Sequence, residues 1–103
     1  MRFGEVIEAM RANPSRKFAR IGWNGKNMFI YLVPEHRVMA SDWTGPKECI
    51  RHEDVMQDDG VTITEHFVLI NGHVDMKTAD GSVIVGWLST QTDMLKDDWV
   101  EVF

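Results

Sequence analysis

Several features that identify common classes of protein are scarce in this sequence of 103 residues. Cys49 is the single cysteine, so no internal disulfide can form, and a reducing cytoplasm is the expected compartment. No window approaches the roughly 20 apolar residues that span a bilayer, and the N-terminal residues lack the long apolar segment of a secretory signal. No dense run of Lys or Arg occurs and the net charge is −5, which argues against binding along duplex nucleic acid. We therefore expect neither a membrane nor a nucleic-acid polymer as partner, whereas a few local donors would suffice for a small anionic ligand.

Motifs of the familiar enzyme classes are missing as well. The sequence has no glycine-rich phosphate loop of the P-loop or Rossmann type. Cys49, His52 and Glu53 do not have the spacing of a nucleophile with its base or of a metal site, and the remaining histidines are scattered. The acidic pairs Asp58-Asp59 and Asp97-Asp98 fit solvated turns. We expect no catalytic residue, no metal site and no cofactor.

The residues that are present are those of an ordinary folded protein. Hydrophobic residues make up 44% of the chain and charged residues 26%, without repeats or low-complexity segments. The length fits one domain, which we place over residues 1–103. A chain this short buries a limited share of its surface, so association between copies would add much to the buried area.

The N-terminal segment has the apolar spacing of a short helix. Phe3, Val6, Ile7 and Met10 recur at i, i+3, i+4 and i+7, which places them on one helix face, and the helix should stop before Asn13-Pro14. A helix of two to three turns is not stable alone, so it must dock on another element. A sheet is the expected platform.

The rest of the chain predicts mainly strands joined by Gly- and Asn-containing turns. The expected strands are residues 17–23, 28–33, 61–70, 74–77, 83–85 and 98–103, and the last should lie at an edge. The poorly patterned segment 35–60 could hold a short strand at 37–40 and one helical turn within 47–56. Residues 28–33 are apolar on both faces, so the helix should cover one face and a second subunit the other. The predicted fold is α+β: a short N-terminal helix packed on a mainly antiparallel sheet of about five or six strands, in a homo-oligomer.

The stretch from His73 to Trp99 mixes aromatic and polar residues in the manner of a small-molecule pocket. Trp87 precedes a turn rich in hydroxyl and amide groups, and Trp23 precedes the polar loop at 24–27. Two indoles at strand ends could stack on bases, at about 1 to 3 kcal/mol per base. The alternative is that each indole closes the core, since indoles bury a large area.

Two polar groups in this stretch have both a binding and a structural interpretation. Asp75 and Lys77 share a strand face and could flank a ligand or form an exposed ion pair. The turn residues Thr90, Gln91, Thr92 and Asp93 offer donors and acceptors suited to ribose and phosphate. Their alternative is a capped turn, in which Thr92 or Asp93 would be the cap.

Five blocks of the sequence together resemble a known family. They are FGEVIEAM (3–10), ARIGWNG (19–25), MFIYLVP (28–34), HVDMKTADG (73–81) and WLSTQTDMLKDDW (87–99). In this order they resemble the small phage proteins of the second Thoeris anti-defence family. The blocks cover about half of the chain, and the last two are the most specific.

The resemblance implies a function and a set of contacts. Proteins of that family look like sponges that bind cyclic nucleotide immune signals, notably glycocyclic ADP-ribose and in some members cyclic dinucleotides, without cleaving them. It implies a homotetramer with pockets between subunits, and inhibition of Thoeris-type or CBASS-type immunity in the cytoplasm of the infected bacterium. The ligand-binding residues that it implies here are Trp23, Asn24, Asp75, Trp87, Thr90, Gln91, Thr92 and Asp93.

The sequence departs from the family pattern in three places, and other functions stay open. Gly86 stands where a proline commonly precedes the tryptophan, Ser89 and Thr90 stand where Pro or Ala and Ser are usual, and residues 35–70 are longer than typical. The alternatives are a nucleotide-cleaving enzyme with His73 and Asp75 as acid and base, and a structural or protein-interaction module whose tryptophans belong to a core or interface.

Overall fold

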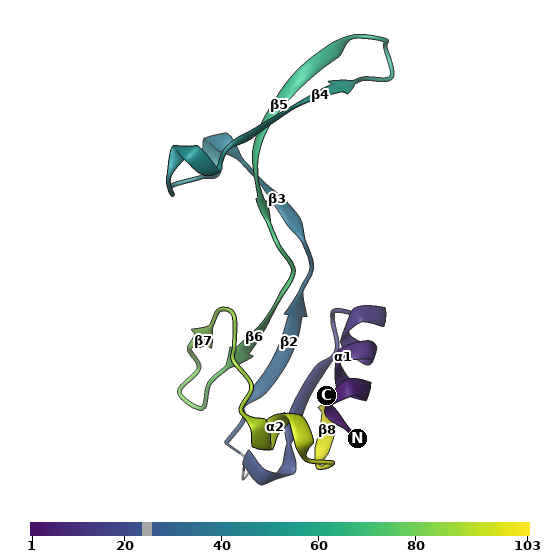
Figure 1. Ribbon diagram of the computed structural model, residues 1–103, viewed down its shortest axis with the longest axis vertical. Coiled ribbons are helices and arrows are strands. Elements are labelled where there is room, and N and C mark those ends of the chain that lie inside the picture. Colours follow the sequence, from purple (N-terminus) through teal and green to yellow (C-terminus); the bar gives the residue numbers. More distant parts are fainter. Residues whose placement is uncertain (24–25) are drawn as a thin grey trace. The chain divides into compact units, whose positions relative to one another are not determined.

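The computed structural model describes residues 1–23 and 26–103, which form two compact units. One unit comprises residues 1–34 and 72–103, and the other comprises residues 35–71 (Figure 1). Each unit contains its own antiparallel sheet, and the helices and strands together make an α+β fold, as predicted. No helix among the described residues is long and apolar enough to cross a membrane. The single domain expected over residues 1–103 stays a prediction.

The first unit begins with helix α1, Phe3–Ala12, close to the predicted range. The Glu5 carboxylate accepts a hydrogen bond from the backbone N–H of Arg2 at 3.1 Å, so it satisfies a donor that the first turn leaves free. At the other end the Asn13 N–H still bonds to the Ala9 carbonyl at 3.0 Å, and Pro14 then ends the helix. Val6 and Met10 are buried, as the apolar spacing predicted.

Five strands form the sheet of the first unit. They are β1 (Lys17–Arg20), β2 (Phe29–Val33), β6 (His73–Lys77), β7 (Val83–Ile84) and β8 (Trp99–Val102). Their order is β7-β6-β2-β1-β8 and all neighbours are antiparallel, so β8 is an edge strand as predicted. The strand expected at 83–85 is limited to two residues because the chain then leaves the sheet toward Gly86.

The core of this unit lies between α1 and one face of the sheet. The buried apolar residues are Val6, Met10, Phe18, Ile30, Met76 and Trp99. The register aligns Phe18 with Ile30 and Ile30 with Met76, so the three side chains form one row under the helix. Burial of each large side chain contributes roughly 1.5 to 3 kcal/mol. On the opposite face Phe29 and Tyr31 are only partly buried, and the second subunit expected there stays a prediction.

One predicted strand is shorter than expected. The prediction for residues 17–23 was wrong beyond Arg20, because Ile21–Trp23 form a single 3₁₀ turn, labelled η1. The Ile21 N–H bonds to the Asp98 carbonyl at 3.0 Å, and the Gly22 N–H bonds to the Asp98 carboxylate at 3.1 Å. These bonds turn the chain out of the strand and carry Trp23 toward the core.

The second unit is a three-stranded sheet with two 3₁₀ turns. Its elements are β3 (His36–Met39), η2 (Ala40–Asp42), η3 (Lys47–Cys49), β4 (Arg51–Met56) and β5 (Thr62–Ile70), and the strand order is β3-β5-β4. The prediction of a helical turn within 47–56 holds only for Lys47–Cys49, since residues 51–56 pair with β5 over six registered positions. With β3 and β4 the described residues contain eight strands instead of the expected five or six.

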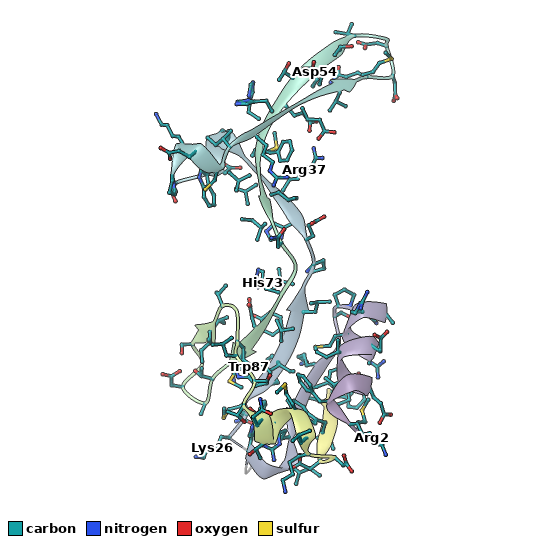
Figure 2. All side chains as sticks on the ribbon, viewed as in Figure 1. Arg2, Lys26, Arg37, Asp54, His73 and Trp87 are labelled. Carbon is teal, nitrogen blue, oxygen red and sulfur yellow. The ribbon has the colours of Figure 1, made fainter. Side chains whose placement is uncertain are left out.

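Charge is divided unequally between the two units. Residues 35–71 hold eight acidic and three basic side chains, whereas the other unit holds eight of each. The second unit therefore carries the whole net charge of −5. Figure 2 labels Arg37 and Asp54 on its sheet; the Arg37 guanidinium bonds to Glu53 at 2.7 Å and to Glu65 at 3.3 Å.

Candidate functional site

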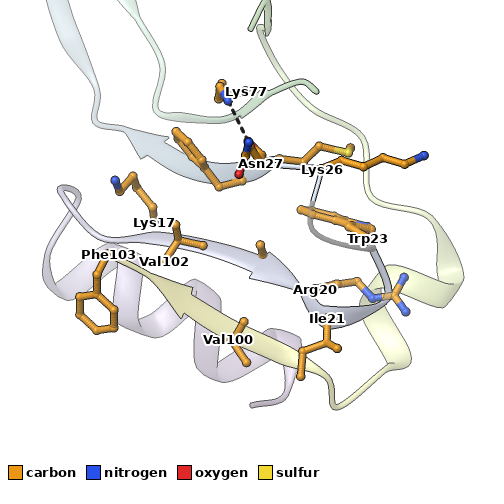
Figure 3. A pocket seen from close by; sticks show the side chains of 13 residues that line it. Lys17, Arg20, Ile21, Trp23, Lys26, Asn27, Lys77, Val100, Val102 and Phe103 are labelled. Carbon is orange, nitrogen blue, oxygen red and sulfur yellow. Dashed lines mark hydrogen bonds between the residues drawn. The ribbon is translucent and has the colours of Figure 1, made fainter. Parts of the chain in front are cut away.

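The sheet face turned away from α1 in the first unit contains a hollow of about 570 Å³. Its floor follows the strand register, with Lys17 opposite Val102 and Phe29 opposite Lys77, while the segment at the end of β1 and residues 26–28 form its side (Figure 3). The residues that line it are Lys17, Ala19, Arg20, Ile21, Trp23, Lys26, Asn27, Met28, Phe29, Lys77, Val100, Val102 and Phe103. A second hollow of about 430 Å³ shares Lys17, Phe29 and Lys77 with it. Both volumes lie within the roughly 300 to 1,000 Å³ of small-molecule sites.

The large hollow is positively charged although its unit is neutral. The basic lining residues are Lys17, Arg20, Lys26 and Lys77, and none of the described lining residues is acidic. The ammonium groups of Lys17 and Lys77 lie 5.2 and 5.6 Å from the centre of the Phe29 ring, within the range of cation–π attraction. Lys77 also donates to the carbonyl of Asn27 at 2.9 Å. An aromatic ring flanked by two ammonium groups suits an anionic ligand that also has a flat, apolar part.

The two predicted tryptophans lie together, in a cluster with Trp99 and Phe3. The ring centres of Trp23 and Trp87 are 6.1 Å apart and their planes meet at 81°, so the contact is edge to face. Trp99 is fully buried 5.2 Å from Trp23 and 6.3 Å from Trp87, and Phe3 lies 6.3 Å from Trp87. Trp23 and Trp87 are partly buried and therefore help to close the core, and Trp23 in addition lines the hollow. Perpendicular rings at this distance cannot hold a base sandwiched between them.

The predicted polar turn is the short helix α2, Gln91–Leu95. Thr90 is its N-cap: the Thr90 hydroxyl accepts from the Asp93 N–H at 3.1 Å, and the Asp93 carboxylate accepts from the Thr90 N–H at 3.1 Å. The expectation that Thr92 or Asp93 would be the cap was therefore wrong, because the helix already begins at Gln91. Gln91 and Thr92 are exposed, and neither lines the large hollow.

Asp93 has a second partner that fixes α2 to the sheet. Arg20 bonds to Asp93 at 2.8 Å and to Asp98 at 2.9 Å. Burial raises the pKa of the Asp93 carboxyl, but hydrogen bonds from Arg20 and Thr90 outweigh burial and hold that pKa below its usual value. The hydrogen bond from Arg20 also lowers the pKa of Asp98. Both carboxylates and the guanidinium are thus ionised at neutral pH and bound to each other.

Asp75 and Lys77, which were expected to flank a ligand or pair with each other, have different partners. Asp75 is only 4% exposed, and one oxygen of its carboxylate accepts from His73 Nδ1 at 2.7 Å and from the Gly86 N–H at 2.9 Å. Lys77 instead contacts Asn27 and Phe29. Neither His73 nor Asp75 lines the large hollow.

The structure thus brings one described member of the predicted set, Trp23, into the hollow. Asn24 lies outside the described residues. Three lining residues, Lys17, Lys26 and Phe29, were not among the predicted site residues. The period of two along 17–19 and 29–31 nevertheless places Lys17 and Phe29 on the face opposite Phe18 and Ile30. The contacts implied for the other predicted residues stay predictions.

Comparison with known proteins identifies the family. The profile of the Thoeris anti-defense 2-like domain matches residues 1–102. A protein named Thoeris anti-defense 2, from Bacillus phage SP01, is 30% identical over 99 residues, which cover 96% of this chain and 91% of the phage protein. The match spans both units, including residues 35–71. This chain belongs to the Thoeris anti-defense 2-like family.

Proposed function

We propose that this protein is a phage anti-defence sponge that binds cyclic nucleotide immune signals and holds them without cleavage. Glycocyclic ADP-ribose is the first candidate ligand, and cyclic dinucleotides are the second. By removing the signal in the cytoplasm of the infected bacterium, the protein blocks Thoeris-type immunity and, where it takes cyclic dinucleotides, CBASS-type immunity. The name of its phage relative supports the Thoeris part of this proposal.

The hollow on the open sheet face is the observation that carries the proposal. Phosphate groups need cationic donors, and the hollow gathers Lys17, Lys26 and Lys77 without a described acidic residue. A nucleobase needs an aromatic face, which Phe29 and Trp23 supply at the floor and the side. The volume of about 570 Å³ is that of a small-molecule site.

Sequestration also fits the chemistry of these residues. A sponge needs preorganised binding groups, whereas catalysis needs a nucleophile or an acid–base pair within reach of the ligand. The hollow offers ammonium groups, amide groups and apolar surface, and its described lining residues include no Ser, Thr, Cys, His, Asp or Glu. Ligand held there would meet charge and aromatic rings but no general base.

Titration calorimetry followed by recovery of the ligand tests this function. The purified protein is titrated with glycocyclic ADP-ribose isomers and with cyclic dinucleotides, and the complex is then heat-denatured and its small molecules identified by mass spectrometry. We expect saturable binding and intact ligand in the supernatant. Absence of binding to every one of these ligands would overturn the sponge proposal, and recovery of cleaved ligand would replace it with an enzyme.

A nucleotide-cleaving enzyme is the second candidate, because His73 and Asp75 form a hydrogen-bonded pair at 2.7 Å. A carboxylate that orients an imidazole is the arrangement of many general bases. The buried carboxylate also bonds to the Gly86 N–H, however, so the same pair has a structural role. Multiple turnover of a cyclic nucleotide that is lost in a His73→Ala variant would establish the enzyme.

Self-association is part of the proposal. The edge strand β8 contributes Val100 and Val102 to the lining of the hollow. Phe103, directly after this strand, also lines it and is 99% exposed. Burial of these apolar groups by a second copy would deepen the hollow and stabilise the assembly. We expect a homotetramer, and light scattering coupled to size-exclusion chromatography measures its mass. A monomer at the concentration used for calorimetry would contradict this part of the proposal.

A further inference from the structure

The strongest feature outside the hollow is a pair of histidines in the second unit. His52 of β4 and His66 of β5 are directly opposite each other in the antiparallel register. Their Nδ1 atoms are 2.5 Å apart, the ring centres are 4.7 Å apart, and both side chains are exposed. They are 14 residues apart in the sequence, which matches no ligand motif, so only the strand pairing brings them together.

We propose that His52 and His66 form a binding site for a divalent transition-metal cation of the kind that imidazole ligates, with Zn²⁺ as the representative ion. Imidazole nitrogen suits Zn²⁺, Cu²⁺ and Ni²⁺, whereas Mg²⁺ and Ca²⁺ prefer oxygen ligands. This site is separate from the anion-binding role of the first unit and does not depend on it.

The geometry is close to what a shared ion requires. Two imidazole nitrogens at the usual Zn–N distance of about 2.0 to 2.1 Å are roughly 3.3 Å apart in tetrahedral coordination. The two Nδ1 atoms therefore have to separate by less than about 1 Å, which rotation of two exposed rings allows without movement of the strands. The described residues contain no group of three or more His, Cys, Asp or Glu suited to a metal ion, so water would fill the remaining positions.

The charge around the pair favours a cation. Asp54 and Thr64 are the next registered pair on the same sheet face, with the Thr64 hydroxyl donating to the Asp54 carboxylate at 2.6 Å. A carboxylate one step along the face attracts an ion bound between the rings and can orient a coordinated water. The unit as a whole carries the chain's net charge of −5. A cation that bridges β4 and β5 would reduce the repulsion among the acidic side chains of this unit and would link the two strands.

Binding of an ion between two neutral imidazole rings needs only a change of tautomer. A hydrogen bond between two neutral rings through Nδ1 requires one ring to carry its proton on Nδ1 and the other on Nε2. When an ion takes both Nδ1 lone pairs, the first ring moves its proton to Nε2 by exchange with water. Both rings stay neutral, so binding releases no net proton where both are already neutral.

Calorimetry of the full-length protein with ZnCl₂ tests the site. We expect one Zn²⁺ per chain in addition to any background, reversal by EDTA, and a higher melting temperature of the second unit. Either His52→Gln or His66→Gln removes half of the site and should weaken binding by more than the 10- to 100-fold typical of changes outside the ligand shell. His36→Gln removes another imidazole of the same unit and is the matched control.

The outcomes distinguish specific Zn²⁺ binding by the two histidines from nonspecific attraction of cations to an acidic surface. Loss of Zn²⁺ binding in both pair variants, retention in the His36→Gln variant, and no comparable response to MgCl₂ support the proposal. Equal binding by the wild type and either pair variant overturns it, and so does an equal response to MgCl₂. Circular dichroism of each variant confirms that the strands persist, and since both positions are exposed we expect no change.

Discussion

The Gly86 N–H donates a hydrogen bond to the buried Asp75 carboxylate at 2.9 Å. Gly86 has a φ of 71°, in the region that favours glycine, and the same carboxylate oxygen accepts from His73. The next residue, Trp87, donates its N–H to the Val74 carbonyl at 2.8 Å. The Asp75 carboxylate thus fixes the segment after β7, which places Trp87 in the aromatic cluster. A proline at position 86, as expected from the family pattern, would have neither the N–H nor the positive φ.

Replacement of Gly86 should destabilise the first unit through backbone strain. In Gly86→Ala the added Cβ meets open space, so the effect comes from φ and should amount to about 1 to 2 kcal/mol of the free energy of unfolding. Urea denaturation monitored by tryptophan fluorescence measures it. Gly4→Ala is the matched control, because Gly4 is helical and also faces open space, and it should stabilise by up to about 1 kcal/mol. Equal effects of the two variants would contradict the assigned role of Gly86.

The Arg20–Asp93–Asp98 network predicts a loss of stability in acid. Hydrogen bonds lower the folded-state pKa of both carboxyls, whereas an unfolded Asp has a pKa of about 3.9. Their stabilisation is therefore complete above that value and is lost as the pH falls through the folded-state pKa. An Asp93→Asn variant should lose about 1.5 to 3 kcal/mol at pH 7, and its unfolding free energy should converge with that of the wild type as the pH falls.

An exposed ion pair provides the control for this network. Arg11 and Glu8 lie 3.8 Å apart on the outer side of α1, with 71% and 76% of their side chains exposed. Arg11→Gln should change the unfolding free energy by less than about 0.5 kcal/mol and leave its dependence on pH unchanged. If the unfolding free energies of the wild type and of Asp93→Asn differ by the same amount at every pH, ionisation of the network contributes nothing to stability.

Local signals predicted most of the first unit. Apolar periodicity located α1, the alternation in the last residues located β8, and the glycine-containing turn expected before β7 is present, with Gly81 at a positive φ. Residues 17–23 were misread because the chain leaves the strand through bonds to Asp98, which lies 76 residues from Gly22. Such long-range contacts leave no local pattern.

The candidate site was less predictable than the fold. Trp23 and Trp87 stood out as large aromatic residues beside polar loops, but their edge-to-face contact depends on the positions of η1 and the chain after β7. The lysines of the hollow come from β1, β6 and the segment before β2, and no single stretch contains them. Thr90 was identified as a polar turn residue, yet its role as the cap depends on where α2 begins.

The lysines of the hollow should control binding of an anionic ligand. Lys17→Ala and Lys77→Ala each remove one charged donor, which corresponds to about 1.5 to 3 kcal/mol, or roughly 10- to 150-fold in the dissociation constant. Calorimetry with glycocyclic ADP-ribose at two salt concentrations measures the loss and the weaker salt dependence that should accompany it. Lys47→Ala lies in the other unit and should bind like the wild type. Unchanged affinity in both hollow variants would place the ligand elsewhere.

The family resemblance assigns Thr90, Gln91, Thr92 and Asp93 of the turn at α2 to the ligand, but only Thr90 and Asp93 also form the hydrogen bonds that begin the helix. Thr90→Ala removes the hydroxyl that accepts from the Asp93 N–H, so it should reduce the unfolding free energy by about 1 kcal/mol, and Thr90→Ser should restore most of this loss. Gln91→Ala and Thr92→Ala change exposed side chains and should stay within about 0.5 kcal/mol of the wild type.

Affinity for glycocyclic ADP-ribose in these same variants then decides whether the turn contacts the ligand. If Gln91 and Thr92 contact it, their replacement weakens binding at unchanged stability, which a structural role alone does not produce. If the ligand lies only in the hollow lined by Lys17 and Phe29, both variants bind like the wild type. If Thr90→Ala lowers the unfolding free energy and the affinity together, the cause is fraying of the first turn of α2. Thr90 then acts on binding through the position of Asp93 and of its partner Arg20.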